Sequence, residues 1–155
     1  ENMFTYFILT LRTSQSRAML GTVANGTFMP SPCGKKVLSV INASFDGNRS
    51  KTPVLFCLMP NHVHMLFRFD KKEKNELVTV ENMKSVLRRT GDRLILISDM
   101  AVFNGILKPK EEGSSPTIWF SCPTIRGIHS ENELKETIFH IENNPQEWKS
   151  DKYYR

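Results

Sequence analysis

The sequence predicts an α+β fold of the ferredoxin-like type, in which helices pack on one face of an antiparallel sheet. Short runs of β-branched and aromatic residues alternate along the chain with longer segments whose apolar residues recur every three or four positions. One pair of short runs is separated by only three residues, which is typical of antiparallel strands joined by a tight turn. The order strand, helix, strand, strand, helix, strand, helix favours a sheet with its helices on one side.

The first half of the chain supplies three expected strands and one helix. The strands are assigned from their β-branched and aromatic content, and the helix from apolar residues at helical spacing after a Ser-Pro start. The expected elements are a strand at 4–13, a turn at Asn25-Gly26, a helix at 31–45, and strands at 52–58 and 62–69.

The second half predicts two helices on either side of an irregular segment. The last helix begins after Ser130, because Ser130 and Glu133 form the capping-box pattern that satisfies backbone amides at a helix start. It ends before Pro145, since proline disfavours helical geometry in the residue that precedes it. The other expected elements are a basic helix at 79–97, a loop at 104–117, and a strand or irregular edge at 117–128.

Length and composition fit one domain spanning residues 1–155. Apolar residues make up 39% of the chain and charged residues 24%, which indicates a globular protein rather than a disordered one. The longest apolar stretch is too short to cross a bilayer, so we expect no membrane partner. Three cysteines without a CxxC pair favour a reducing cytoplasm. The net charge of +5 permits nucleic-acid binding without establishing it.

Two histidines two positions apart are the sharpest chemical feature. In the run 59–64, Met-Pro-Asn-His-Val-His, His62 and His64 lie on one face of the expected strand while Val63 faces the core. Their imidazoles can converge on one divalent ion, and Mg or Mn becomes reasonable when a carboxylate or amide and a phosphate complete the site. The alternative is a polar sheet face that binds nothing.

The run 58–66, Leu-Met-Pro-Asn-His-Val-His-Met-Leu, resembles the HUH segment of the insertion-sequence-200-type single-tyrosine transposases, particularly the REP-associated tyrosine transposases. The six-residue core of this run is specific, and the remaining similarities are supportive. They extend over nearly the whole chain, and include residues 6–13, 83–86, Trp119, 133–134 and 141–145.

This resemblance implies a function, a metal and partners. Family members cleave and rejoin single-stranded DNA beside hairpins, usually as dimers. Two histidines and a polar residue on the last helix hold a divalent metal, and a tyrosine on that helix attacks the scissile phosphate. For this chain it therefore implies single-stranded or hairpin DNA and a homodimer as partners, Mg or Mn as the metal, and His62, His64 and Asn144 as its ligands.

The nucleophile position departs from the family pattern. The segment 140–144 reads His-Ile-Glu-Asn-Asn, so His140 stands where the family has its tyrosine. Histidine cannot form the phosphotyrosine link. Tyr153 and Tyr154 could replace it if the end of the chain reaches the metal, whereas Tyr6 suits packing in the first strand. His140 itself could be a third imidazole ligand, an ordinary surface histidine, or a base that activates water.

The helix at 79–97 carries a basic set that could contact DNA phosphates or simply face solvent. Trp119 and Phe120 could stack bases or belong to the core. Three functions therefore remain open: an active nicking and joining enzyme, a DNA-binding module that has lost the chemistry, and a metal-dependent hydrolase that uses water. A relic that binds nothing is a fourth. The candidate DNA-binding residues are Lys84, Arg88, Arg89 and Arg93.

Overall fold

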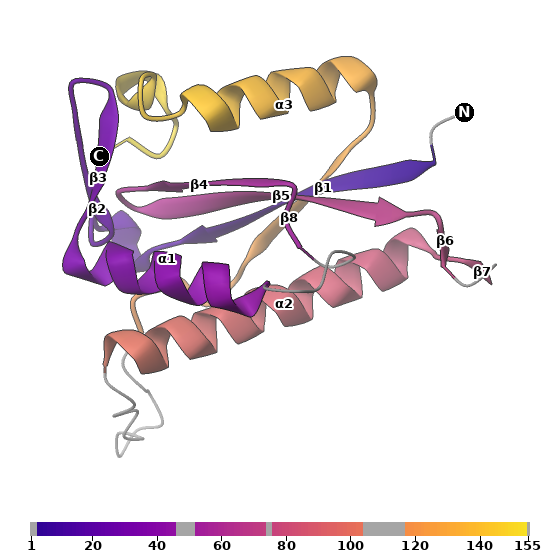
Figure 1. The fold of residues 1–155 in the computed structure, drawn as a ribbon, viewed down its shortest axis with the longest axis horizontal. Coiled ribbons are helices and arrows are strands. Elements are labelled where there is room, and N and C mark those ends of the chain that lie inside the picture. Colours follow the sequence, from indigo (N-terminus) through magenta and orange to yellow (C-terminus); the bar gives the residue numbers. More distant parts are fainter. Residues whose placement is uncertain (1–2, 46–51, 74–75, 104–116, 155) are drawn as a thin grey trace.

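Four strands form the central antiparallel sheet of the computed structural model, which describes residues 3–45, 52–73, 76–103 and 117–154 (Figure 1). The strand order is β4-β5-β1-β8, so β1 pairs with β5 and β8, which are the third and fourth strands of this sheet in chain order. This order, with a helix after the first and third strands, is the ferredoxin-like arrangement. The strands are β1 (Phe4–Arg12), β4 (Leu55–Met59), β5 (His62–Asp70) and β8 (Thr124–Ile128).

Each of the three long helices begins at a hydroxyl side chain that accepts a hydrogen bond from a backbone amide of the first turn. The N-cap residues are Ser31, Thr79 and Ser130, and such caps satisfy amides that have no partner within the helix. The helices are α1 (Pro32–Ser44), α2 (Val80–Val102) and α3 (Glu131–Asn143), with short 3-10 turns at Ser14–Ser16 and Trp148–Ser150.

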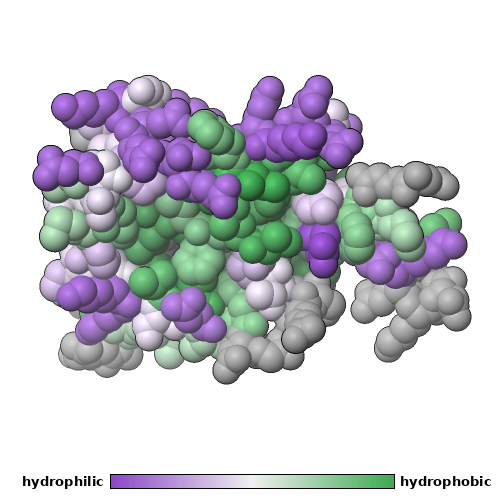
Figure 2. All heavy atoms as spheres, turned by 45° about the horizontal axis from the view of Figure 1, so that its top comes forward, coloured by the Kyte–Doolittle hydropathy of each residue, from purple (hydrophilic) through white to green (hydrophobic). Residues whose placement is uncertain are grey.

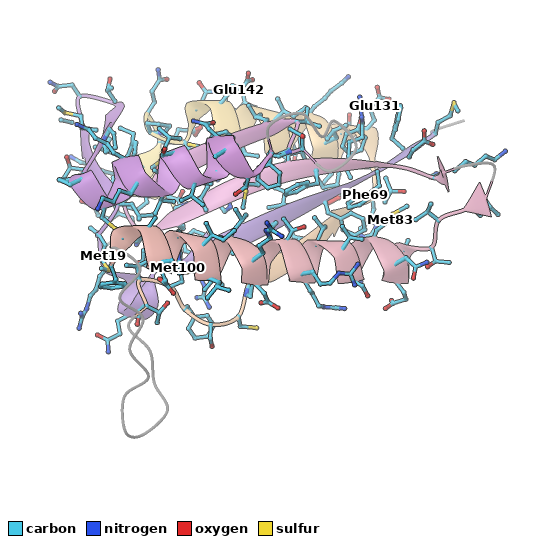
Figure 3. The ribbon with its side chains drawn as sticks, turned by 60° about the horizontal axis from the view of Figure 1, so that its bottom comes forward. Met19, Phe69, Met83, Met100, Glu131 and Glu142 are labelled. Carbon is cyan, nitrogen blue, oxygen red and sulfur yellow. The ribbon has the colours of Figure 1, made fainter. Side chains whose placement is uncertain are left out.

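Helices α1 and α2 cover one face of the sheet and α3 covers the other (Figure 1). Figure 3 looks from the α1 and α2 side, where Met83 and Phe69 lie in front, whereas Glu131 and Glu142 of α3 lie behind the sheet. The prediction of an α+β fold with an antiparallel sheet is confirmed. The prediction that the helices pack on one face is wrong for α3.

The position of α3 follows from a sheet that is apolar on both sides. Phe7, Leu9 and Leu11 of β1 pack into the large core beneath α1 and α2. Ile8, between them, points the other way and joins a smaller core with Ile141 of α3. Because both faces of the sheet carry apolar side chains, both need a covering layer.

The expected elements form, with shifted ends. The strand expected at 52–58 starts at Leu55, the helix expected at 79–97 continues to Val102, and only Thr124–Ile128 of the segment 117–128 is a strand of the sheet. Residues 104–116 of the expected loop lie outside the described residues. In the described part of the chain, no helix is long and apolar enough to cross a membrane.

Two small hairpins complete the described structure. The first was expected only as a turn: Asn25 and Gly26 have positive φ values of 52° and 73°, which suits the two central residues of a tight hairpin. Its strands are β2 (Gly21–Ala24) and β3 (Thr27–Pro30). The strands of the second hairpin are β6 (Lys72–Glu73) and β7 (Glu76–Leu77).

Candidate functional site

The two histidines lie at the start of the interior strand β5, on the face of the sheet that α3 covers. Strand pairing places His64 between Thr10 of β1 and Cys57 of β4, and His62 is flanked in the same way by Arg12 and Met59. The rings of His62 and His64 are 4.6 Å apart between centroids. Val63 is fully buried in the large core on the opposite face, so the predicted division of faces is confirmed.

Each imidazole has one nitrogen engaged by a neighbouring side chain. Nδ1 of His64 lies 2.8 Å from the hydroxyl oxygen of Thr10, and Nδ1 of His62 lies 2.9 Å from Oδ1 of Asn61. Oδ1 of an asparagine can only accept a hydrogen bond, so the proton of neutral His62 lies on Nδ1. The lone pair of His62 is therefore on Nε2, as a metal ligand requires.

Burial keeps both histidines neutral. Loss of hydration, followed by the positive charge of neighbouring groups that include His140 and Lys152, lowers the pKa of His62 to about 2 and that of His64 to about 3. Both rings are therefore in the uncharged form that coordinates metals at neutral pH. Burial also raises the pKa of the Cys57 thiol to about 11, with a smaller contribution from Asp151, so this thiol stays protonated and is a poor ligand.

The C-terminal tail folds back over the histidines. The ring of Tyr153 lies 4.3 Å from that of His62 and 5.7 Å from that of His64, between centroids. Nδ2 of Asn61 donates a hydrogen bond of 2.7 Å to the backbone carbonyl of Tyr153, which fixes the tail to the histidine motif. The tail also brings in Asp151, whose Oδ2 lies 4.0 Å from Nε2 of His62.

Helix α3 brings His140 to the site, and its C-cap residue Asn144 follows one turn later on the same side of the helix. The ring of His140 lies 5.9 Å from that of His64, and its Nε2 is 4.0 Å from Oδ2 of Asp151. Asn144, one turn later, is completely buried. His140 is therefore not an isolated surface histidine, although 47% of its side chain is exposed.

Four buried polar atoms of the histidine motif, the tail and the C-cap of α3 have no hydrogen-bond partner among the residues that the structure describes. They belong to three side chains, and they are Nε2 of His62, Oδ2 of Asp151, and both Oδ1 and Nδ2 of Asn144. Buried polar groups are almost always paired, so a concentration of unpaired ones indicates a place for a bound group. Within the described ranges, no three or more His, Cys, Asp and Glu side chains already have the spacing of a metal centre.

The other predicted residues are distributed unequally around this site. Tyr153 reaches it, whereas Tyr154 packs its ring against Trp148. Trp119 is fully buried in the large core, and Phe120 is 44% exposed beneath the guanidinium of Arg12. The predicted DNA-binding set lies on α2, across the sheet from the histidines, and consists of Lys84, Arg88, Arg89 and Arg93.

Sequence reasoning missed three charged residues near the histidines. Arg12 projects from β1, next to the histidine strand, Arg126 projects from β8 on the far side of β1, and Asp151 comes from the tail. The position of Arg12 could have been predicted, because Arg12 follows Thr10 by two positions and therefore shares its face of the strand. Asp151 carried none, since its approach depends on how the tail folds. Figure 2 turns the α3 side forward and shows hydrophobic side chains across the middle of this face with hydrophilic ones around them.

Comparison with solved structures identifies the fold. A REP-associated tyrosine transposase bound to a REP hairpin matches over 96% of this chain and 70% of its own, with a TM-score of 0.52 and 9% sequence identity. The chain has the fold of that transposase. A provisionally named transposase from Deinococcus radiodurans R1 covers 92% of both chains at 15% identity, with a TM-score of 0.48. No family model and no curated protein sequence matches the chain.

Proposed function

We propose that this chain is a single-domain member of the HUH single-tyrosine transposases that binds single-stranded or hairpin DNA together with a divalent metal. The observation that carries the proposal is the pair of buried, neutral imidazoles, set side by side on a sheet whose fold matches a hairpin-bound transposase. The resemblance of the run 58–66 to the HUH segment agrees with it.

The residues present fit a metal. His62 directs a lone pair from Nε2, and the buried amide of Asn144 has no hydrogen-bond partner. With His64 they make the ligand set of the resemblance, for which we propose Mg or Mn. Such an ion, when bound, polarises a phosphate and stabilises the charge that develops on it.

DNA binding follows from the charges around the histidine row. Arg12 and Arg126 lie on the same face as the histidines, both to one side of β5, and the exposed ring of Phe120 lies beside Arg12, so phosphates and an unpaired base can be contacted on the same face. The basic residues of α2 lie on the far face, and we propose them as a separate phosphate contact.

We propose the phenol hydroxyl of Tyr153 as the nucleophile. His140 cannot make the family linkage, and the ring of Tyr153 packs on His62. In this step the phenol oxygen bonds to phosphorus, the bond from phosphorus to the 3′ oxygen breaks, the phenol gives up its proton and the 3′ oxygen takes one up. A water-using nuclease is the second candidate, because His140 lies beside a carboxylate that could orient it as a base.

A labelled single-stranded hairpin oligonucleotide, incubated with the protein and Mn or Mg, tests the proposal. We expect a salt-sensitive shift on a native gel and, on a denaturing gel, an adduct that is lost in Tyr153→Phe and kept in Tyr154→Phe. Cleavage without an adduct would favour the water-using nuclease, and a shift without cleavage would leave an inactive binding module. Absence of any shift at low salt would refute the DNA-binding function.

We further propose that the protein forms a homodimer and acts in the cytoplasm. Helix α3 exposes 61% of Phe139, which offers apolar surface for a second copy of the chain. The cysteines of the described chain are free, as a reducing compartment requires. Light scattering on the purified protein measures the oligomeric state, and a mass equal to one chain at micromolar concentration would contradict the dimer.

A further inference from the structure

We infer that His140 and Asp151 complete the histidine pair as metal ligands in place of Asn144, and that these four side chains form a centre for a zinc-type ion. The inference rests on the metal site proposed above and changes its composition. The pair of histidines alone, with an amide, would serve Mg or Mn, whereas three imidazoles and a carboxylate favour Zn²⁺.

The carboxylate of Asp151 is the first observation. Its side chain is only 2% exposed, and Oδ2 has no hydrogen-bond partner even though it lies 4.0 Å from Nε2 of both His62 and His140. A buried carboxylate oxygen left unpaired is costly unless an ion or another donor neutralises it. The other oxygen, Oδ1, accepts a hydrogen bond of 2.8 Å from the backbone amide of Tyr153, which holds the carboxylate in place.

The separations between the groups are the second observation. Two ligands about 2.1 Å from a tetrahedral ion are about 3.4 Å apart, so each pair made by Asp151 needs to close by about 0.6 Å. By the same geometry, the ring centroids of imidazoles on one ion lie about 5 Å apart. The His62–His64 and His64–His140 centroid distances, 4.6 and 5.9 Å, fall on either side of that value.

The side chains can make this closure without moving the sheet. His62 and His64 are fixed by strand pairing and by their Nδ1 partners, but His140 is half exposed on α3 and Asp151 follows a 3-10 turn at Trp148–Ser150. Movement of these two side chains brings their donor atoms toward the fixed pair. The tail and α3 thus supply the adjustable half of the centre, and β5 the rigid half.

In this arrangement, the histidine that stands at position 140 in place of the family's tyrosine is a metal ligand. A tyrosine there would offer a phenol oxygen, whereas His140 offers an imidazole nitrogen 4.0 Å from the carboxylate of Asp151. Imidazole is a common zinc ligand and a rare magnesium ligand. Zinc held by four protein ligands would have no free position, so a phosphate oxygen could bind it only in place of one of them.

Isothermal titration of the purified full chain with Zn²⁺, without DNA, tests the inference. We expect one ion per chain, no displacement by millimolar Mg²⁺, and affinity about 1,000-fold lower in both His140→Ala and Asp151→Asn, more than the roughly 10–100-fold that the loss of an outer-shell partner costs. The matched controls are His129→Ala, the histidine outside the site, and Glu147→Gln, an exposed carboxylate of the same tail; both should bind zinc as the wild type does.

A second measurement on the wild type avoids any effect of substitution on folding. Histidine ring signals followed by NMR during the zinc titration should shift for His62, His64 and His140 and stay unchanged for His129. Zinc binding that leaves the His140 signals unchanged, wild-type affinity in either His140→Ala or Asp151→Asn, or equal competition by Mg²⁺ would overturn the inference. Because no DNA is present, these results are independent of whether the hairpin binds.

Discussion

Acidification should destabilise the metal-free protein through His62 and His64. Burial, supported by neighbouring positive charge, lowers their pKa values from 6.5 to about 2 and about 3. The unfolded chain takes up both protons as the pH falls through 6.5, whereas the folded chain stays unprotonated at these rings until the pH approaches 3. The unfolded state binds more protons in this window, so stability rises with pH across it and is fully present above about pH 7.

The size of the effect follows from the two shifts. Each histidine that protonates only in the unfolded state costs about 1.4 kcal/mol for every pH unit below 6.5. Between pH 7.5 and pH 5.0 the loss is about 2 kcal/mol for one histidine and about 4 kcal/mol for both. This is a large share of the roughly 5–15 kcal/mol that stabilises a typical domain.

Urea unfolding at several pH values, with a chelator present to exclude metal, measures this loss. The wild type should lose about 4 kcal/mol of unfolding free energy between pH 7.5 and pH 5.0 relative to a His62→Gln/His64→Gln double variant. His129→Gln should follow the wild type, because His129 is exposed in the loop before α3. An equal pH dependence in the wild type and the double variant would refute the reasoning, since the carboxylates are common to both.

Three further substitutions test the packing that positions the site. Gly34→Ala should cost about 1–3 kcal/mol of unfolding free energy, seen as a lower melting temperature, because the backbone carbonyl of Leu20 occupies the space of the added Cβ; an unchanged melting temperature would contradict this close approach. Ser98→Ala should cost about 1–3 kcal/mol in urea unfolding, because the buried indole N–H of Trp119 loses its 2.7 Å acceptor, and Ser85→Ala on the same helix serves as the control. Ser130→Ala should cost about 1 kcal/mol and speed hydrogen exchange at the start of α3, and unchanged exchange there would show that the cap does not hold the helix.

The part of the site that follows from local geometry could be predicted from the sequence. Side chains alternate along any strand, so His62 and His64 had to share a face and Val63 had to take the other. The tight turn before them fixed the pairing with β4. Asn144 was expected beside His140 because residues four apart are neighbours on a helix. These relations depend on a few residues in a row and need no knowledge of the tertiary structure.

The face that α3 covers could not be predicted in the same way. Its apolar stripe shows that α3 packs on something, but Ile8 of β1 and Leu66 of β5 place apolar side chains on the face opposite the large core, so the stripe suits either side of the sheet. The basic residues of α2 were affected by the same ambiguity. They were expected to contact DNA phosphates or to face solvent, and the sheet lies between them and the histidines, whereas Arg12 and Arg126 lie on the histidine face.

The approach of the tail depends on contacts between residues far apart in the chain. Asp151 and Tyr153 lie about ninety positions after the histidines and follow no periodic pattern. What fixes them is the hydrogen bond from Nδ2 of Asn61 to the carbonyl of Tyr153, a contact across 92 positions. A terminal segment with such an anchor is ordered, whereas the general expectation for chain ends is a loose tail.

Asn61 connects the geometry of the strand to that of the tail. Its Nδ2 donates to the carbonyl oxygens of Ser16 and Tyr153, so its orientation is set and Oδ1 must face Nδ1 of His62. An aspartate at this position would keep the acceptor for His62 but lose both donors, and would release the tail while preserving the tautomer. An alanine would lose both functions. Strand β5 therefore determines on which face of the sheet the His62 imidazole lies. Asn61 determines its tautomer and positions the segment that carries Asp151. The carboxylate consequently reaches the nitrogen of His62 that holds the lone pair.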